Sequence, residues 1–414
     1  MMDINKIYCE NCLDTMSRMP DNFIDCCVTS PPYYGLRDYG TAKWVGGIED
    51  CQHTGARVNP INVGGFTGER LRKINGSENE KYLKYKNTCP DCSAVRIDEQ
   101  IGLEETPELY VQKLVHVFAE VKRVLKKEGT LWLNLGDSYY NISPGNGGFG
   151  KKQKTNKGSH YDNSRKIKYE GIKPKDLVGI PWMVAFDLRA DGWYLRQDII
   201  WHKPNPMPES VTDRCTKAHE YIFLLSKSSK YYYDADSIKQ TVVDATVLRM
   251  AQQIEKQKGS ERVPGKTNGN IKAVGPGRNP RKGGDTNGGN QASDNGIPAM
   301  ALNGNGVTGH SGYFDSCGNL IGNGMANKKS VWTICTMPFK EAHFATFPED
   351  LIIPCIKAGS PEGGIVYDPF SGAGTTVLVS HKLKRQFIGS EISQEYCDIA
   401  QKRIQPYLDQ KTLF

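Results

Sequence analysis

The chain has 414 residues, twelve of them cysteines, and a formal net charge of +7. This length can bury a full α/β core and still carry insertions, because single cores stop growing at roughly 250–300 residues. The sequence has no run of about 18 apolar residues, the length of a membrane-spanning helix, and no export signal at its start. We therefore expect a soluble, unexported protein with reduced cysteines, and its charge suits a polyanionic partner.

The first predicted strand covers residues 22–29 and ends abruptly at Ser30. Two prolines follow there, and proline cannot donate to a β-ladder. Residues 35–101 are polar and rich in Gly, Asn and Lys. This composition indicates an insertion on the loop that follows the first strand.

The clearest helix comes next, with Thr106 as its cap and Pro107 in its first turn. Its apolar residues are spaced by three and four, as expected for one buried face. We expect Gly129 to end the helix and a strand to follow over residues 130–135. Residues 141–170 are again rich in Gly, Lys and Asn, which predicts a mobile basic loop.

The rest of the chain alternates between helix and strand, apart from one long insertion. The predicted elements are a helix over 181–190, strands over 193–201 and 364–367, a helix over 375–384, a strand over 386–390 and a helix from Ser393. Residues 242–329 lose apolar periodicity and fill with Gly, Asn and basic residues, which is typical of a loop-rich insertion. The alternation predicts an α/β fold with a mostly parallel, doubly wound sheet.

A glycine-rich turn, DPFSGAGTT, begins at Asp368 and opens a predicted helix. Its glycines allow the backbone to pass close to a ligand at the carboxyl end of a strand. The next strand ends at Glu391, whose carboxylate can accept both hydroxyl hydrogens of a ribose. The turn departs from G-x-G-x-x-G, so it suits a nucleotide-like cofactor without a pyrophosphate, such as S-adenosylmethionine.

A second motif, TSPPY, lies at the end of the first strand. Its two prolines fix φ and remove both amide donors, so that carbonyl oxygens remain as acceptors. The Pro31 carbonyl and the Ser30 hydroxyl could draw an exocyclic amino nitrogen towards a tetrahedral, nucleophilic geometry. Tyr33 offers a ring on which an extruded base can stack. Taken alone, the motif fits equally well an ordinary strand terminator with a packing tyrosine.

Together the two motifs resemble those of the amino-group DNA methyltransferases, the N4-cytosine/N6-adenine family, in the class whose catalytic motif precedes the cofactor motif. The segments LWLNLGDSYY, DIIWHKPNPMPES, AHEYIFLLSK and HFATFPEDL extend the resemblance over most of the chain. It implies a permuted Rossmann-like methyltransferase sheet with loop-rich insertions, in which the strands of Ser30 and Asp368 lie close together. It also implies transfer of a methyl group from S-adenosylmethionine to a flipped base of double-stranded DNA, in one in-line displacement.

The resemblance also assigns individual residues. The catalytic residues would be Ser30, Pro31, Pro32 and Tyr33. The cofactor would be held by Asp368, Phe370, Gly372, Gly374, Thr375 and Glu391, with Phe344, Thr346 and Phe347 lining its methionine end. Relatives usually carry Gly-Asp where this chain has Glu10-Asn11, and Asn11 can still bond the adenine edge through its amide. Ser before Pro-Pro-Tyr favours N4 of cytosine, whereas Asp there is typical of enzymes that modify N6 of adenine, which stays the alternative.

Three alternative functions would require sequence features that differ from those found here. Methylation of a cytosine ring carbon needs a cysteine nucleophile, usually after proline, and the single Pro-Cys pair, at Cys355, lies in a predicted helix. A protein glutamine methyltransferase also uses Pro-Pro-Tyr, but typically with Asn before the prolines and in the unpermuted order. A non-catalytic, zinc-containing nucleic-acid-binding protein would leave the TSPPY motif unexplained.

The insertion after the first strand contains four candidate zinc ligands, Cys51, His53, Cys89 and Cys92. Three thiolates and one imidazole suit a tetrahedral structural zinc, and a loop too polar to bury a core would gain folding energy from it. Two further pairs have nominal ligand spacing. We interpret Cys9 and Cys12 as core thiols, and Cys215 with His219 as structural residues.

We expect five segments: a core part with the SPPY motif at 1–40, the insertion with a zinc knuckle at 41–100, core at 101–202, a target-recognition region with the basic Gly/Asn-rich insertion at 203–330, and core with the cofactor motif at 331–414. Candidate DNA contacts are Lys203, Asn205, Arg278, Arg281 and Lys282. The expected location is the cytoplasm of a bacterial or phage-infected cell. A homodimer and a cognate restriction endonuclease, as in restriction-modification systems, are left open.

Overall fold

The computed structural model describes residues 2–35, 41–48, 50–51, 89, 92–140, 171–241, 313–314, 320–321, 325–337 and 347–409. The chain divides into two compact units, Met1–Asp234 with Ser330–Phe414, and Ala235–Lys329. Among the described residues, no helix combines the length and apolarity needed to cross a membrane.

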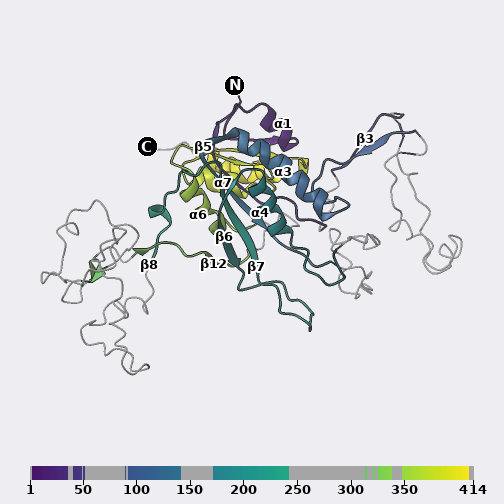
Figure 1. The fold of residues 1–414 in the computed structure, drawn as a ribbon. Coiled ribbons are helices and arrows are strands. Elements are labelled where there is room, and N and C mark those ends of the chain that lie inside the picture. The colour runs from purple at the N-terminus through teal and green to yellow at the C-terminus, as the bar shows by residue number, and fades with distance from the viewer. Residues whose placement is uncertain are drawn as a thin grey trace, which may run out of the picture. The chain divides into compact units, whose positions relative to one another are not determined.

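An eight-stranded sheet forms the centre of the larger unit (Figure 1). Its order is β1 (Lys6–Cys9), β14 (Gln386–Glu391), β13 (Ile365–Asp368), β2 (Ile24–Thr29), β5 (Leu125–Leu135), β7 (His219–Ser226), β6 (Tyr194–His202) and β12 (Val331–Thr333). Within this sheet β7 runs antiparallel to both of its neighbours, and the remaining pairs are parallel. The expected mostly parallel sheet is therefore confirmed.

The pairing of β13 with β2 brings the two ends of the chain together. Val366 pairs with Cys26 and Tyr367 with Cys27. The strand before the glycine-rich turn is thus the direct neighbour of the strand before the SPPY motif. This is the arrangement of the permuted Rossmann-like sheet that the resemblance implied.

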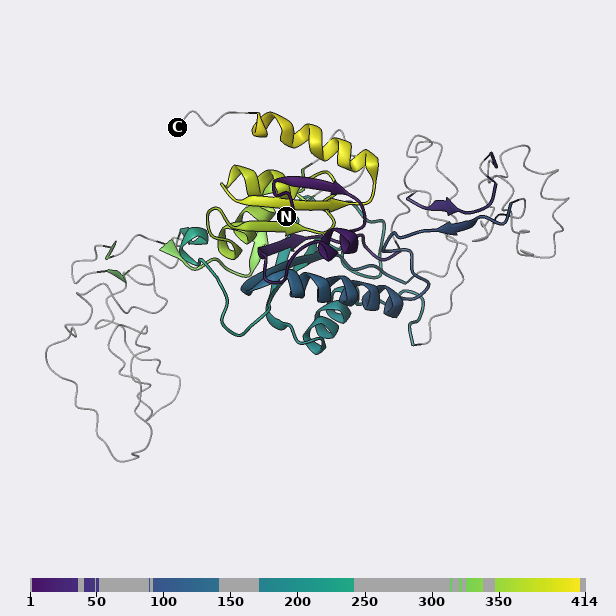
Figure 2. The same cartoon turned by 90° about the horizontal axis from the view of Figure 1, so that it is seen from above.

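Helices cover both faces of the sheet (Figure 2). One face carries α1 (Cys12–Ser17), α3 (Pro107–Val124) and α4 (Ile180–Ala190), and the other carries α6 (Glu349–Gly359), α7 (Thr375–Lys382) and α8 (Gln394–Leu408). Successive side chains of a strand point to opposite faces of the sheet. Because helices cover both faces, these strands carry apolar residues at successive positions. In β14, for example, Ile388 belongs to the core cluster that includes residues of α1, α3 and α4, while Phe387 packs with residues of α7 and α8.

Two predicted boundaries are corrected. Helix α3 ends at Val124, and the chain passes directly into β5, so Gly129 lies inside a strand rather than ending a helix. A Cβ on Gly129 would come within 2.9 Å of the Asp25 carbonyl oxygen, so close strand packing explains the glycine. Strand β7 falls within residues 203–330, so the core sheet extends past the boundary expected at residue 203.

Short elements complete the described structure. In the insertion, β3 (Lys43–Val45) pairs antiparallel with β4 (Val95–Ile97). In the unit Ala235–Lys329, the 3₁₀ helix η2 (Asp236–Ile238) precedes β8 (Gln240–Thr241), which pairs with β11 (Met325–Ala326), and β9 (Tyr313–Phe314) pairs with β10 (Leu320–Ile321).

Candidate functional site

The two sequence motifs meet at one edge of the sheet. Strands β1, β2, β13 and β14 all end at this edge, and the antiparallel β7 begins there, as ligand sites of open α/β sheets require. A cavity of about 720 Å³ lies at the edge. Its lining combines predicted catalytic and cofactor residues, namely Ser30, Pro31, Pro32, Tyr33, Asn11, Phe347, Phe370, Gly372, Thr375 and Glu391.

The cofactor end of the cavity is built on backbone amides. Glu391 accepts hydrogen bonds of 2.9 Å from the amides of Gly372 and Ser393, and burial raises the pKa of its carboxyl. Gly372 and Gly374 have φ values of +51° and +76°, which favour glycine. A Cβ on Gly374 would also lie 2.8 Å from the Cβ of Ala400, so α7 could not approach α8 as closely.

The residues at this end fit a nucleoside-type cofactor. Ser371 lines the cavity, and its buried hydroxyl has no hydrogen-bond partner within the described part of the chain. Phe370 and Phe347 add apolar surface. Asn11 also lines the cavity, but its amide caps α1 by accepting from the Leu13 amide at 3.0 Å, and it donates to Glu99 at 3.1 Å.

Asp368 lies behind the cavity rather than in its lining. Its Oδ1 accepts from the Thr29 hydroxyl at 2.6 Å and from the Phe370 amide at 3.0 Å. Its side chain is fully buried, and burial raises the pKa of the carboxyl to about 6. Asp368 therefore ties the strand before Ser30 to the glycine-rich turn and orients both motifs.

At the other end of the cavity, Pro32 and Tyr33 of the SPPY motif are held by side chains from neighbouring elements. The Tyr110 hydroxyl donates to the Pro32 carbonyl at 2.8 Å. The Tyr33 hydroxyl donates to Glu220 at 2.7 Å, and burial, followed by the Glu220 carboxylate, raises the pKa of the phenol. Its ring lies so close to Gly136 that a Cβ there would be 2.5 Å from ring carbon Cε2. The tyrosine is therefore neutral and fixed in orientation.

Sequence reasoning missed part of this cavity. Asn134, Trp201 and Glu220 also line it, and so does Lys203, which was expected to contact DNA from the target-recognition region. A usable signal was present, because Asn134 and Glu220 are polar residues within or beside the apolar runs LWLNL and YIFLL. Asn205 is exposed. Its side-chain amide donates to the Thr336 carbonyl at 3.2 Å and accepts from the Thr336 backbone amide at 3.0 Å.

Several predicted site residues lie outside the described residues. They are Phe344, Thr346, His53, Arg278, Arg281 and Lys282. Cys355, the alternative nucleophile, is buried inside α6, as expected for a structural residue. Cys12 is buried as well, and its pKa is raised to about 12 by burial, which suits a core thiol. Cys9 is exposed, so its interpretation as a core thiol is wrong.

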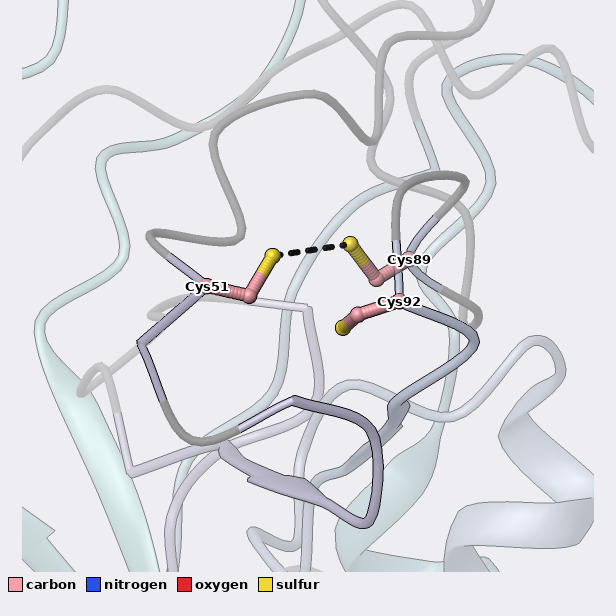
Figure 3. Close-up of side chains that lie close together, drawn as sticks. All are labelled: Cys51, Cys89 and Cys92. Atoms are coloured by element: carbon pink, nitrogen blue, oxygen red, sulfur yellow. Dashed lines mark hydrogen bonds between the residues drawn. The ribbon is translucent and has the colours of Figure 1, made fainter.

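Three of the four predicted zinc ligands meet in the insertion. Figure 3 shows the thiols of Cys51, Cys89 and Cys92 turned towards one another from two chain segments. The sulfur atoms all lie within 4.8 Å of each other, and those of Cys51 and Cys89 are 3.8 Å apart. Within the described residues this is the single group of three or more side chains close enough to share a metal ion.

Backbone amides stabilise the thiolate form of one of the three cysteines, Cys92. The amides of Ile48 and Ala94 donate to Cys92 and lower its pKa to about 6. Gly47 has a φ of +82°, and a Cβ there would lie 2.6 Å from the sulfur of Cys92. The Cys89 amide donates to the Ala94 carbonyl at 2.7 Å, and the Ser93 amide donates to the Cys89 carbonyl at 2.9 Å, so Cys89 is held against the segment that carries Cys92.

Sequence comparison identifies the family to which this fold and this cavity belong. The chain belongs to the N6/N4 methyltransferase family, described as DNA methylase, whose sequence profile matches residues 24–402. It is 34% identical to the Type II methyltransferase M.Cfr9I of Citrobacter freundii, over 95% of this chain and 85% of that protein. It is 33% identical to the Type II methyltransferase M.SmaI of Serratia marcescens, over 96% and 90% of the two chains.

Solved structures with a similar arrangement are more distant in sequence. The PvuII DNA methyltransferase (cytosine-N4-specific) is 13% identical with a TM-score of 0.48, and the match covers all of this chain and 89% of that one. The M1.HpyAVI–SAM complex is also 13% identical, with a TM-score of 0.40 and coverage of 96% and 98%.

Proposed function

We propose that this protein methylates the exocyclic amino group of a base flipped out of double-stranded DNA, with S-adenosylmethionine as the methyl donor. One observation carries the proposal: the SPPY motif and the glycine-rich turn with Glu391 line the same cavity. A donor held by one motif and an amino group held by the other would therefore meet there, and such positioning accounts for much of the rate of a direct displacement.

Each residue has a physical role in this scheme. When bound, S-adenosylmethionine supplies a methyl group on a positively charged sulfur. Glu391 would accept from the ribose hydroxyls, and Ser371 offers an additional hydroxyl. On the base side, the Ser30 hydroxyl and the Pro31 carbonyl would accept the two amino hydrogens and direct the nitrogen lone pair at the methyl group.

Within this proposal we favour N4 of cytosine over N6 of adenine. The support is the serine at position 30, because Asp before Pro-Pro-Tyr is typical of the adenine enzymes. The relatives named above are Type II methyltransferases. We therefore also propose that the protein acts beside a cognate restriction endonuclease.

Tritium transfer tests the reaction, and sequencing tests the base. Purified protein with labelled S-adenosylmethionine should label duplex DNA and leave added protein substrates unlabelled. Long-read sequencing of DNA from cells that express the protein should then show N4-methylcytosine at one sequence. Label in protein, or no label at all, would contradict the proposal, whereas N6-methyladenine would contradict the choice of base alone.

Target reading must involve residues outside the catalytic cavity, because the cavity handles a single base. We propose that the unit Ala235–Lys329 reads the DNA sequence, and that Arg278, Arg281 and Lys282 contact phosphates. The support is its composition, rich in Gly, Asn and basic residues. Asn205 has a competing role, because its amide is already bonded to Thr336.

We further propose a structural zinc bound by Cys51, Cys89 and Cys92, with His53 as the predicted fourth ligand. The geometry of the three thiols supports it. The exposed apolar residues of the β3–β4 pair and its flanks also support it. They include Val45, Ile48, Val95 and Ile97. Hydrophobic burial therefore contributes little here, and a metal would supply the missing folding energy.

Elemental analysis of the full chain, purified without chelator, should find about one zinc per protein, and X-ray absorption should give sulfur distances of about 2.3 Å. Cys89→Ser should lose the metal, while Cys215→Ser, which removes an exposed cysteine outside the cluster, should keep it. The metal should leave affinity for S-adenosylmethionine unchanged, because methyl transfer needs no Lewis acid. Metal-free wild-type protein, or a Cys89→Ser variant with full zinc content, would defeat the proposal.

A further inference from the structure

A polar cluster lies beside Tyr33, formed by side chains from two strands and from the residue that follows a third. Asn134 belongs to β5 and Glu220 to β7, and Lys203 directly follows β6. Oε2 of Glu220 accepts from the Tyr33 hydroxyl at 2.7 Å and from Asn134 at 3.3 Å. Oε1 of Glu220 forms an ion pair with Lys203. All four side chains line the cavity.

Glu220 holds Tyr33 in place, but its ion pair with Lys203 is costly for the fold. The two side chains are only 18% and 15% exposed. Removing two charges from water is costly, and apolar residues of similar size often stabilise a fold as well or better. A charged pair kept at the end of apolar strands therefore indicates a ligand that interacts with one of the two charged groups.

Lys203 keeps hydrogen-bond donors available for such a ligand. An ammonium group carries three N–H donors. Within the described part of the chain, the Lys203 ammonium donates to Glu220 alone and lies 4.2 Å from the centre of the Trp201 ring. Glu220 also offsets its charge, so that Lys203 can present donors in the cavity without a net positive charge.

We propose that Lys203 donates a hydrogen bond to the ring nitrogen next to the amino-bearing carbon of the flipped base. The inference rests on the proposed function. The contacts in the cavity support it, because Tyr33 hydrogen-bonds to Glu220, Glu220 pairs with Lys203, and Ser30 lines the same cavity. Because Ser30 and Lys203 line the same cavity, the proposal places the adjacent ring edge of a base whose amino group meets Ser30 against Lys203.

This contact would select the bases that carry an acceptor at that ring position. Cytosine N3 and adenine N1 are acceptors. Thymine N3 and guanine N1, at the corresponding position of the Watson–Crick edge, carry hydrogen, so each would place its own N–H donor against the donors of the ammonium group. Flipped bases are read by hydrogen bonds to this edge. A site built to donate rejects strongly a partner that leaves it unpaired. The inference holds for either amino base, so it does not depend on the choice of cytosine.

A base analogue isolates this one contact. Once the wild-type target is known from sequencing, duplexes with the natural base are compared with duplexes carrying 3-deazacytosine, or 1-deazaadenine, in which C–H replaces the ring nitrogen. We expect Lys203→Met to lower kcat/KM on the natural base about 10- to 100-fold, the range for a charged hydrogen bond. Wild-type protein should lose a similar factor on the deaza base, and the variant should lose almost nothing further on it.

Control variants separate this role from a structural one. Lys126→Met removes an ion-paired lysine at the opposite edge of the sheet, 2.7 Å from Asp25, and should remain fully sensitive to the deaza base. Lys203→Gln keeps a neutral donor and should recover part of the activity, even if Lys203→Met melts early. If either Lys203 variant lost the full factor again on the deaza duplex, the lysine would act independently of the ring nitrogen and the inference would be overturned. Wild-type protein that methylates no DNA would overturn the proposed function instead.

Discussion

The two ends of the cavity are held by different kinds of interaction. At the cofactor end, Glu391 is held by amides from the short stretch between the glycine-rich turn and α8. At the base end, Tyr33, Glu220 and Lys203 are held by one another, and they come from parts of the chain far apart in sequence. The cofactor end therefore depends on backbone amides close together in sequence, whereas the base end depends on a network of side chains.

This difference predicts that binding and turnover can be separated by mutation. Backbone amides stay in place when a side chain changes, so substitutions at the cofactor end should alter affinity without altering how the base is held. A side-chain network transmits any change to its neighbours, so substitutions at the base end should alter the rate. Substitutions at the two ends should therefore separate cofactor affinity from turnover.

Removing the Ser30 hydroxyl should have the largest effect. In Ser30→Ala we expect kcat to fall on the order of 10²- to 10³-fold, the usual loss for one group that orients or stabilises the reacting atoms. Affinity for S-adenosylmethionine, measured by calorimetry, should not change. Ser17→Ala removes an exposed hydroxyl that bonds the Asp14 carbonyl and should change neither quantity. A loss of cofactor affinity in Ser30→Ala would show that the two ends are coupled.

The carboxyl of Asp368, which joins the two ends, should make stability depend on pH. Its pKa is raised by burial to about 6, so the folded protein keeps a proton that the unfolded chain loses above about pH 4. The free energy of unfolding should therefore fall as the pH rises from about 4 to about 6, by at most about 3 kcal/mol from this group. Asp368→Asn keeps the oxygen that accepts from Thr29 but cannot titrate.

Urea unfolding of both proteins at several pH values measures this contribution as the difference between them. The advantage of the wild type over Asp368→Asn should be greatest near pH 4 and should level off above pH 6. A difference that is constant over this range would show that the carboxyl is not held protonated.

At the cofactor end, Glu391→Gln should raise the dissociation constant of S-adenosylmethionine about 10- to 100-fold. The neutral amide has one acceptor oxygen where the carboxylate has two, and charged hydrogen bonds contribute about 1.5–3 kcal/mol. At saturating cofactor, kcat should stay near the wild-type value. Glu362→Gln changes an exposed carboxylate outside the cavity and serves as the control. Unaltered affinity in Glu391→Gln would remove the ribose assignment.

The smallest effect should come from Tyr110→Phe. This change removes the hydrogen bond to the Pro32 carbonyl but keeps the buried ring, so we expect a loss of about 1 kcal/mol, or roughly fivefold in kcat. Tyr8→Phe removes a hydroxyl that bonds the Asp3 carbonyl at 2.9 Å and should have no such effect. An unchanged rate would show that the SPPY loop holds its shape without Tyr110.

The cofactor end could be predicted from the sequence because its parts are neighbours along the chain. The glycine-rich turn, the helix it opens and Glu391 at the end of the next strand all lie within residues 368–391. Local rules on turn residues, strand ends and helix starts are enough for such a unit. The other predicted core elements, apart from α3 and β5, agree with the structure to within two residues, whereas β1, α1, β7 and β12 were not predicted.

The position of Lys203 was decided only by the tertiary structure. Lys203 opens the proline-rich stretch KPNPMP just after a predicted strand, so sequence reasoning placed it with the target-reading region. The antiparallel β7 instead brings Glu220 beside the end of β6, and the ion pair draws Lys203 into the cavity. The same holds for Asp368, whose carboxyl bonds Thr29 across 339 positions of sequence rather than lining the cavity.

What the sequence determined by itself was therefore the type of sheet, the order of the two motifs and the chemistry each offers. Those properties depend on the pattern of residues within short segments. What only the tertiary structure decided was which distant side chains share a proton or a charge. That depends on strand order, because β13 beside β2, and β7 between β5 and β6, set the distances at which hydrogen bonds and ion pairs form.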